Sequence, residues 1–283
     1  MPSNAPSDVP PQCLIQVDDV GVTYAGGAVT ALHRCSLAVG RGEFTVLLGH
    51  SGAGKSTLLR CLNRLVPPTS GRVVVDGLGD LTDRLALHRH RRQTGMVFQQ
   101  HQLIARHSAL TNVLLGRIGY HPTWRTLLPL GRGEQRVALE CLDRVGLLHK
   151  ALDRVDNLSG GEQQRVGIAR ALAQQPKIVL ADEPVASLDP ATARRVLTLL
   201  HDVCRQDRIT AVVSLHQVEL AKQFADRVVG LAGGRVVFDG PPQELSADVV
   251  ARLYHAGNRD VAPGDNPAEE PDLDDAIAAA ASA

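Results

Sequence analysis

The stretch at 49–57 reads Gly49-His50-Ser51-Gly52-Ala53-Gly54-Lys55-Ser56-Thr57, and this stretch decides the fold. It follows a continuous apolar run at 44–48, typical of a strand buried on both faces, and it opens a helical pattern over 55–64. The spacing G-x-x-x-x-G-K-[ST] between a strand and a helix predicts a phosphate-binding loop (P-loop). Its glycines let backbone N–H groups wrap phosphates, and the helix N-terminus favours their negative charge. We therefore expect Lys55 to reach the β- and γ-phosphates of a nucleotide and Ser56 to ligate Mg²⁺.

A second apolar run, at 177–181, ends in two acids, Asp182 and Glu183. Ligands of α/β proteins bind at the carboxyl ends of the strands, so these acids are expected beside the nucleotide. Asp182 is predicted to hold the Mg²⁺ shell, and Glu183 to orient and deprotonate a water that faces the γ-phosphate. For the acid pair alone, a solvated acidic turn would be the preferred interpretation. Because a P-loop occurs earlier in the chain, we prefer the interpretation that the two acids belong to a nucleotide site.

Strand and helix patterns alternate along the rest of the chain, which indicates an α/β class with a mainly parallel sheet. Short antiparallel strands are predicted near the N-terminus, and a mostly helical stretch interrupts the sheet, giving an inserted helical subdomain at about 100–165. We expect a flexible leader at 1–12, one folded domain at 13–256 and an acidic, Ala-rich, disordered tail at 257–283. The predicted strands are 14–20, 35–39, 72–75, 96–98, 209–214, 228–231 and 235–238, and the later helices are 191–205 and 217–224.

Composition excludes several classes of protein. The chain has 283 residues, with 44% hydrophobic and 21% charged, which is ordinary for a globular protein. No apolar run reaches the roughly 18 residues that cross a bilayer, and the N-terminus has no secretion-signal pattern. The five cysteines form no C-x-x-C pair, so we expect reduced thiols in the core.

Charge is unevenly distributed along the chain. Seven acidic residues and no Lys or Arg lie in 260–283, which leaves 30 basic against 23 acidic residues elsewhere. This excess of basic residues is small and is distributed along the chain rather than concentrated in one patch, so no nucleic-acid partner is expected. The densest basic run, 88–92, is interpreted as a solvated helix face rather than a polyanion site.

The stretch at 158–165 (the signature loop) precedes a strong helix and contains a second exposed helix start. Ser159 and Glu162 have capping-box spacing, which is a structural role in itself. Gly160 and Gly161 also leave the helix N-terminus open to a close approach by an anion. One nucleotide needs only one glycine-rich helix N-terminus for its phosphates, so this second anion-binding helix start (the second cradle) requires an explanation.

The signature loop resembles the signature motif of ABC-type ATPases, and the family's other motifs occur in its order over about 14–245. The resemblance implies a P-loop NTPase (RecA-like) ABC ATPase core with an N-terminal antiparallel β subdomain, binding ATP and Mg²⁺. The further matches are Tyr24 as the adenine-stacking aromatic, Gln99 as the Q-loop glutamine, Ser187-Leu188-Asp189 as the D-loop and His216 as the switch histidine.

The family also accounts for the second cradle. Two cassettes bind head to tail in that family, and each signature loop caps ATP held by the other P-loop. The resemblance therefore implies a homodimer in which Ser159, Gly160, Gly161 and Asp189 contact ATP in trans. Within one chain it implies the catalytic residues Glu183, His216 and Gln99, the metal ligands Ser56, Gln99 and Asp182, and ATP binding by Tyr24 and the P-loop.

A closer resemblance concerns the transported cargo. The stretches 106–120, 121–128, 214–218 and 237–242 resemble the phosphonate importer branch of the family. This implies an ATPase subunit that couples hydrolysis to phosphonate uptake, peripheral to the bacterial inner membrane on its cytoplasmic side. Its implied partners are integral membrane permease subunits and, indirectly, a periplasmic phosphonate-binding protein.

Two alternatives stay open. The cargo of such an importer could instead be phosphite, hypophosphite or a polar amino acid. A soluble ABC ATPase acting on DNA or ribosomes is a different class. The DNA-repair version would need a long heptad insertion, which is absent between Gln99 and Leu158.

Overall fold

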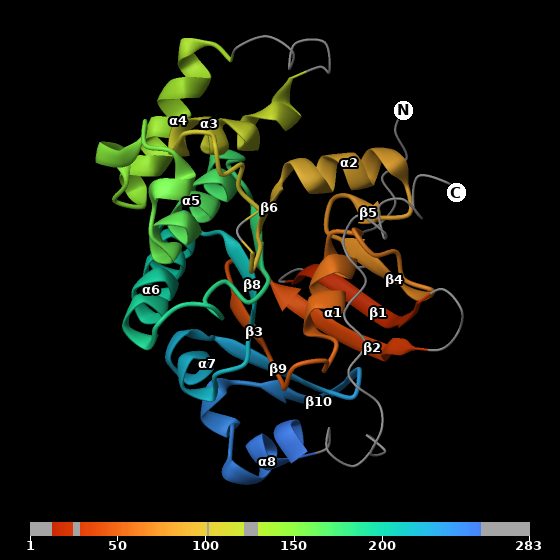
Figure 1. Cartoon of the computed structure of the whole chain (residues 1–283). Coiled ribbons are helices and arrows are strands. Elements are labelled where there is room, and N and C mark those ends of the chain that lie inside the picture. Colours follow the sequence, from red (N-terminus) through yellow and green to blue (C-terminus); the bar gives the residue numbers. More distant parts are fainter. Residues whose placement is uncertain (1–12, 25–28, 101, 122–129, 256–283) are drawn as a thin grey trace.

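The computed structural model describes residues 13–24, 29–100, 102–121 and 130–255. Its centre is a six-stranded sheet in the order β10-β9-β3-β8-β7-β6 (Figure 1). Five of these strands are parallel, and β10 pairs antiparallel with β9. The bounds are β3 Phe44–Leu48, β6 Thr94–Val97, β7 Ile178–Ala181, β8 Thr210–Leu215, β9 Arg227–Ala232 and β10 Arg235–Gly240. The predicted α/β class is confirmed.

The two faces of this sheet carry different layers, as alternation along β3 shows. Leu47 packs in one cluster with helix α1 (Lys55–Leu62) and with a second, antiparallel sheet. Val46 and Leu48 point the other way and pack with α6 (Pro190–Gln206) and α7 (Val218–Phe224). Every residue of β3 is buried, which explains its continuous apolar sequence. A last helix, α8 (Ala247–His255), follows η5 (Pro242–Glu244) and contacts β9 and β10.

The second sheet has four strands in the order β2-β1-β4-β5. The bounds are β1 Cys13–Thr23, β2 Thr30–Gly40, β4 Ser70–Val75 and β5 Gly79–Asp80. All its pairings are antiparallel, as expected from the sequence, but β1 and β2 are longer than predicted. The register of β1 shifts between Val17 and Val20 against β2, and between Asp18 and Gly21 against β4. Such a shift breaks the strict alternation of apolar and polar residues, so the alternating pattern stops before β1 ends.

Helices occupy the stretch between β6 and β7. Helices α3, α4 and α5 pack on one another through Val113, Ala138, Leu142 and Ile168, all of which are fully buried. The bounds are α3 Ala109–Leu114, η1 Leu115–Tyr120, α4 Arg132–Arg144, η3 Leu148–Lys150, η4 Val155–Asn157 and α5 Gly160–Ala173. This is the helical subdomain. The predicted leader, the predicted tail and residues 122–128 of the stretch 121–128 lie outside the described residues, and the predicted domain boundaries stay predictions.

All five cysteines are buried and free, as predicted. Burial raises the pKa of Cys61 and of Cys204 to about 12, so both thiols stay protonated and inert. Within the described ranges, no helix has the length and apolar character that crossing a bilayer requires.

The basic run at 88–92 belongs to α2 (Arg84–Arg92). The prediction of a solvated face is right for Arg89 and Arg92, which are exposed, but wrong for His90, which is fully buried. His90 Nε2 lies 2.9 Å from the carbonyl oxygen of Leu62, at the end of α1, and so donates to it. Burial lowers the pKa of His90 to about 4. The imidazole is therefore a neutral link between α2 and α1.

This link predicts a loss of stability in mild acid. The unfolded imidazole binds a proton near pH 6.5 and the folded one only near pH 4. The stabilisation is therefore complete above pH 6.5 and is lost as the pH falls toward 4, by about 2 kcal/mol between pH 7 and pH 5. Denaturant unfolding at both pH values measures it. His90→Gln, which cannot ionise, should flatten the pH dependence, and His88→Gln on the exposed face should not. Equal pH dependence in the wild type and His90→Gln would contradict this assignment.

Candidate nucleotide site

Four predicted functional segments follow four neighbouring strands. Because β6, β7, β8 and β3 are parallel and adjacent, their carboxyl ends meet at one edge of the sheet. The P-loop follows β3, His216 follows β8, Asp182 follows β7, and Gln99 lies two residues beyond β6. Residues far apart in sequence thus converge where α/β sheets bind ligands, as the sequence predicts.

The P-loop wraps the first turn of α1. Gly54 caps this helix with a φ of 97°, a conformation that side chains other than glycine rarely adopt. Lys55 is only 4% exposed, and its Nζ donates to the carbonyl oxygens of Gly49, at 3.0 Å, and His50, at 2.9 Å. The ammonium group and the helix N-terminus together form a site of concentrated positive potential, suited to phosphates.

The two acids after β7 contact this loop directly. Glu183 Oε1 lies 3.3 Å from Lys55 Nζ, and Ser56 Oγ donates to Asp182 Oδ1 at 2.7 Å. Glu183 has a φ of 42°, an uncommon conformation for a residue with a side chain. Backbone strain of this kind collects at functional sites, where the surrounding contacts hold it in place. The structure therefore brings together the four residues on which the predicted chemistry depends most.

The donor set suits Mg²⁺. Ser56 offers a hydroxyl and Asp182 a carboxylate, which is 5% exposed. Mg²⁺ is usually bound by one or two such oxygen ligands together with phosphate oxygens and waters. In the described ranges no group of three His, Cys, Asp or Glu side chains forms the cage that other metals favour. Gln99, the third predicted ligand, is exposed, and its role at the metal stays a prediction.

Sequence reasoning missed two residues at this site, Ser214 and Arg60. Ser214 Oγ, at the end of β8, donates to Asp182 Oδ1 at 3.0 Å and accepts from the N–H of Glu183 at 2.8 Å. Arg60 Nη2 lies 3.8 Å from Asp182 Oδ2. The one sequence signal for Ser214 is its place two residues before His216.

The remaining predicted residues of the site lie around this centre. The hydroxyl of half-buried Tyr24 lies 3.2 Å from Thr57 Oγ1, so the aromatic ring is beside the P-loop helix. His216 is exposed, and its carbonyl oxygen accepts from the hydroxyl of Tyr254 in α8 at 2.5 Å. Stacking on adenine by Tyr24 and a catalytic role for His216 are not tested by these contacts and stay predictions.

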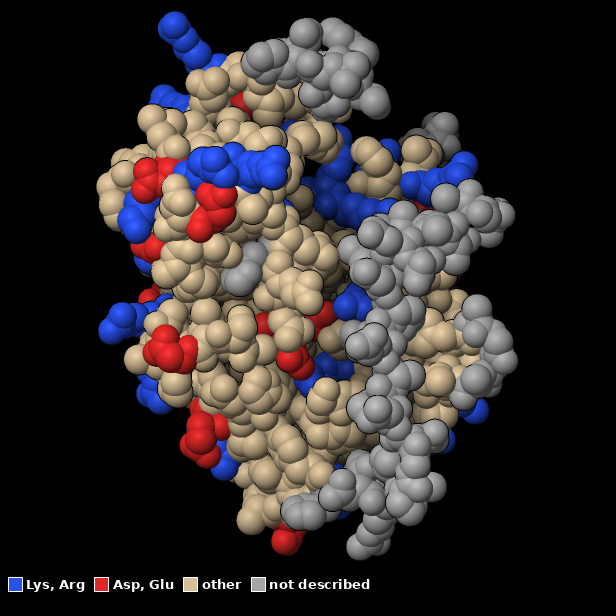
Figure 2. Space-filling view, in the orientation of Figure 1, with Lys and Arg blue, Asp and Glu red and all other residues tan. Residues whose placement is uncertain are grey.

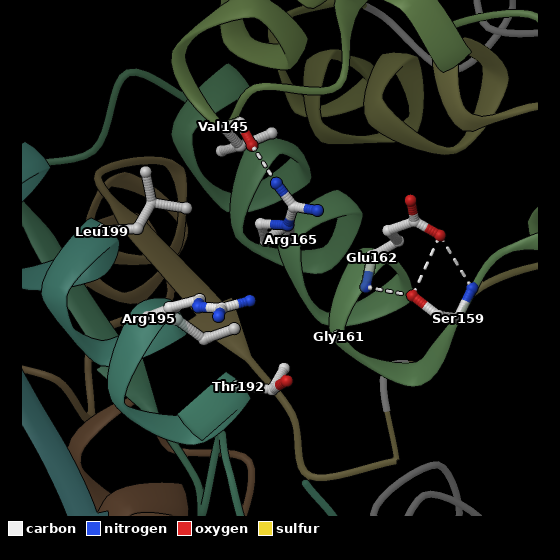
Figure 3. A pocket seen from close by; sticks show the side chains of 9 residues that line it. Val145, Ser159, Gly161, Glu162, Arg165, Thr192, Arg195 and Leu199 are labelled. Atoms are coloured by element: carbon white, nitrogen blue, oxygen red, sulfur yellow. Dashed lines mark hydrogen bonds between the residues drawn. The ribbon is translucent and has the colours of Figure 1, made fainter. Parts of the chain in front are cut away.

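The signature loop starts α5 with a complete capping box. The Ser159 hydroxyl accepts from the N–H of Glu162, and the Glu162 carboxylate accepts from the N–H of Ser159 (Figure 3). Lys150 Nζ donates to Glu162 Oε1 at 2.6 Å, and this hydrogen bond is the main reason that the pKa of Glu162 is lowered to about 2. The capping role is therefore real. Ser159 and Gly160 are nevertheless exposed.

The signature loop lies against the start of α6, next to the D-loop. A Cβ on Gly161 would stand 2.5 Å from Thr192 Cγ2, so a larger residue there would require Thr192 to shift. Asp189 caps α6 by accepting from the N–H groups of Ala191 and Thr192, and the hydrogen bonds from Thr192 lower its pKa. A pocket of about 370 Å³ opens between α5 and α6, and Arg165 and Arg195 extend into it (Figure 3).

One chain does not combine its signature loop with its own P-loop. Leu58 and Leu59 of α1 pack on one face of the six-stranded sheet, whereas Val166 and Ile168 of α5 pack on the other. No hydrogen bond joins the described residues 158–165 to the P-loop. The helices that follow the P-loop and the signature loop of a single chain therefore belong to different layers.

A groove of about 390 Å³ separates the core from the helical subdomain. Its walls come from the end of α1, α2 and β6 on one side and from η1 and α5 on the other, and Figure 2 shows Lys and Arg side chains gathered at a recess beside α2. Arg91 and Arg170 line it. Asn63 and Gln174 also line it, and Asn63 Oδ1 and Gln174 Oε1 are buried acceptors without a hydrogen-bond partner among the described residues.

Known proteins share this sequence and fold. A family model described as ABC transporter matches residues 32–186. The chain is 62% identical to the phosphite import ATP-binding protein PxtA of Stutzerimonas stutzeri, over 91% of this chain and 93% of that protein. It is 58% identical to the phosphonates import ATP-binding protein PhnC 3 of Nostoc sp., over 85% of this chain and 92% of that protein.

A solved structure supports the same conclusion. The dimeric post-hydrolysis state of the ATP-binding cassette MJ0796, bound to ADP and Pi, is 36% identical, with a TM-score of 0.71. The similarity covers 81% of this chain and 99% of that one. With the converging strand ends and the contacts of Lys55 and Ser56 with the two acids, these similarities show that the chain belongs to the ABC transporter family of ATP-hydrolysing cassettes.

Proposed function

We propose that this chain is the ATP-hydrolysing subunit of an importer that couples hydrolysis to phosphonate uptake across the bacterial inner membrane. It would be peripheral to the membrane, on the cytoplasmic side. The proposal of ATP hydrolysis rests on two contacts between the P-loop and the acids. Lys55 contacts Glu183, and Ser56 contacts Asp182. The relatives named for phosphite and phosphonates import support the transport part.

The chemistry follows from the positions of these side chains. Lys55 and the N–H groups of residues 49–57 would bind the phosphates, and Tyr24 would stack on the adenine. Glu183 would take a proton from the attacking water, with His216 and Gln99 orienting the water and the γ-phosphate. Mg²⁺, held by Ser56, Asp182 and Gln99, would neutralise charge that develops on the phosphate oxygens. Positioning and electrostatics therefore supply the catalysis.

The complete site needs a second copy of the chain. Because α1 and α5 pack on opposite faces of the sheet, Ser159, Gly160 and Gly161 face away from their own P-loop. A head-to-tail homodimer would place them, with Asp189, against ATP on the partner. The dimeric cassette structure bound to ADP and Pi supports this arrangement.

The groove beside α2 is our proposed contact for the permease. A helix of the permease on the cytoplasmic side is the occupant to which we commit. Acidic groups on it would complement Arg91, which is itself fixed by the carbonyl oxygens of Asn63 and Arg64.

Phosphite is the second candidate cargo, because the 62% identical relative is named for phosphite import. Phosphite and phosphonates are both tetrahedral oxyanions with one non-oxygen substituent on phosphorus. An ATPase subunit does not touch the cargo, so the discrimination would lie in a separate periplasmic binding protein that donates hydrogen bonds to the headgroup.

Growth of a deletion strain tests the proposal. Loss of this gene should abolish growth on an alkylphosphonate as sole phosphorus source and leave growth on inorganic phosphate intact. The wild-type gene should restore growth, and a Glu183→Gln gene should not. Loss of growth on phosphite alone would move the cargo to phosphite. Unchanged growth on both, in a strain with no second copy of such a gene, would overturn the importer assignment.

A further inference from the structure

We propose that Ser214 is a positioning residue whose single hydroxyl sets the geometry of both acids of the site. This inference rests on the roles proposed above for Asp182 and Glu183. Ser214 Oγ donates to Asp182 Oδ1 at 3.0 Å and accepts from the N–H of Glu183 at 2.8 Å. One oxygen atom therefore contacts the metal-binding acid through its side chain and the general base through its backbone.

The Ser214 hydroxyl connects the two strands just beyond the last backbone pair between β7 and β8. The last pair in that ladder is Ala181 with Val213, so Asp182 and Ser214 are the next positions on the two strands. The N–H of Asp182 faces the other neighbour of β7 and donates to the carbonyl oxygen of Val97 in β6, at 2.9 Å. Ser214 Oγ then links β8 to the acid pair by a side-chain contact instead of a ladder bond.

Burial prevents water from replacing the hydrogen bonds of the Ser214 hydroxyl. Ser214 has no exposed surface, and Asp182 is 5% exposed, so water is poorly placed to replace the hydroxyl. The N–H of Glu183 would then lack its acceptor, at a residue whose φ of 42° already needs support. Losing the hydroxyl should therefore allow Glu183 to relax away from Lys55 and from the water that it is proposed to activate.

Asp182 depends on Ser214 for a second reason. Asp182 Oδ1 accepts from two hydroxyls, Ser56 Oγ at 2.7 Å and Ser214 Oγ at 3.0 Å. Ser56 is expected to ligate Mg²⁺ through a lone pair of its oxygen when nucleotide binds, which leaves its O–H able to donate to Asp182. Ser214 is the hydroxyl of this pair that takes no part in the predicted metal binding, so it orients the carboxylate with or without nucleotide, and it lies near the end of β8, two residues before His216.

The test compares Ser214→Ala with Ser214→Thr and Thr210→Val. Thr210 is the matched control, because its hydroxyl is equally buried on β8 and accepts the N–H of Gly42 at 2.8 Å, at the other end of the strand. Ser214→Ala should lower kcat about 10-fold with the KM for ATP within about twofold, since misplaced groups cost rate more than binding. Ser214→Thr should recover most of the rate, and Thr210→Val should keep it.

Two further measurements separate positioning from a general loss of structure. Mn²⁺ bound with a non-hydrolysable ATP analogue, followed by electron paramagnetic resonance, should show several-fold weaker affinity in Ser214→Ala and unchanged affinity in Thr210→Val. Hydrogen exchange should become faster at the peptide containing Glu183 in Ser214→Ala only. Wild-type kcat and Mn²⁺ affinity in Ser214→Ala would overturn the inference, and so would loss of its cooperative unfolding, because the hydroxyl would then serve the fold as a whole.

The inference and the proposed function fail in different ways. An active Glu183→Gln protein would refute the assignment of the acids, whatever Ser214→Ala does. An inactive Glu183→Gln protein beside a fully active Ser214→Ala protein would leave the site assignment intact and remove only Ser214 from it.

Discussion

Glu183→Gln should lower ATP hydrolysis by about 10²- to 10⁴-fold, the usual loss when a general base is removed. The amide has nearly the size of the carboxylate and still forms hydrogen bonds, but it cannot accept the proton of the attacking water. Glu183 Oε1 lies 3.3 Å from Lys55 Nζ, so the substitution also removes a negative charge beside the phosphate-binding ammonium group. ATP binding should therefore persist, and the protein should accumulate as a closed dimer with ATP.

Steady-state phosphate release measures the first effect, and size-exclusion chromatography with ATP measures the second. Glu140→Gln is a suitable control, because Glu140 is an exposed partner of Arg136 on α4, outside the site. It should hydrolyse ATP at the wild-type rate. Activity of Glu183→Gln within about twofold of wild type would exclude Glu183 as the base, since even the weakest general bases contribute more.

The centre of the site could be predicted because its residues belong to short continuous sequence motifs. A buried strand followed by a glycine-rich turn and a helix specifies its own geometry, so Lys55 and Ser56 could be placed from spacing alone. The acids after β7 could be placed beside them because parallel strands end at a common edge. The contacts at 3.3 Å and 2.7 Å agree with both expectations.

Contacts that depend on strand register could not be predicted in this way. Ser214 meets Asp182 because β8 pairs with β7 at one particular register, and nothing in the sequence around 214 specifies that register. His90 is a second case. It lies in a run of charged residues, and its burial follows from the contact of α2 with the end of α1, which a charge pattern does not encode.

The ends of elements were harder to predict than their existence. The helix after the P-loop was expected to continue to 64, but α1 ends at Leu62. Arg64 adopts a φ of 49°, and its N–H donates to the carbonyl oxygen of Cys61, so the chain turns before the predicted helix end. The apolar pattern does not register such a turn, because Leu65 and Val66 continue it on the far side.

Ser159→Arg should abolish ATP hydrolysis while leaving ATP binding intact. Ser159 is exposed at the start of α5, where an arginine adds bulk and positive charge on the surface proposed to cover the partner's nucleotide. The substitution also removes the helix cap, at a cost of about 1 kcal/mol. Ser108→Arg controls for that cost, because Ser108 caps α3 by the same type of contact with the N–H of Thr111 and lies outside the signature loop. It should remain active as an isolated cassette.

Mixing Ser159→Arg with Lys55→Ala then decides whether the site is shared between chains. Each protein alone should be inactive. In a mixed dimer, the intact P-loop of the first faces the intact signature loop of the second, so one composite site is restored. With random pairing, half of the dimers are mixed and each has one of two sites, so activity should reach at most about a quarter of wild type. A site within one chain gives no recovery, because every chain in the mixture then carries a damaged site. Recovery on mixing therefore separates the two arrangements, and the packing of α1 and α5 on opposite faces of the sheet favours the shared one.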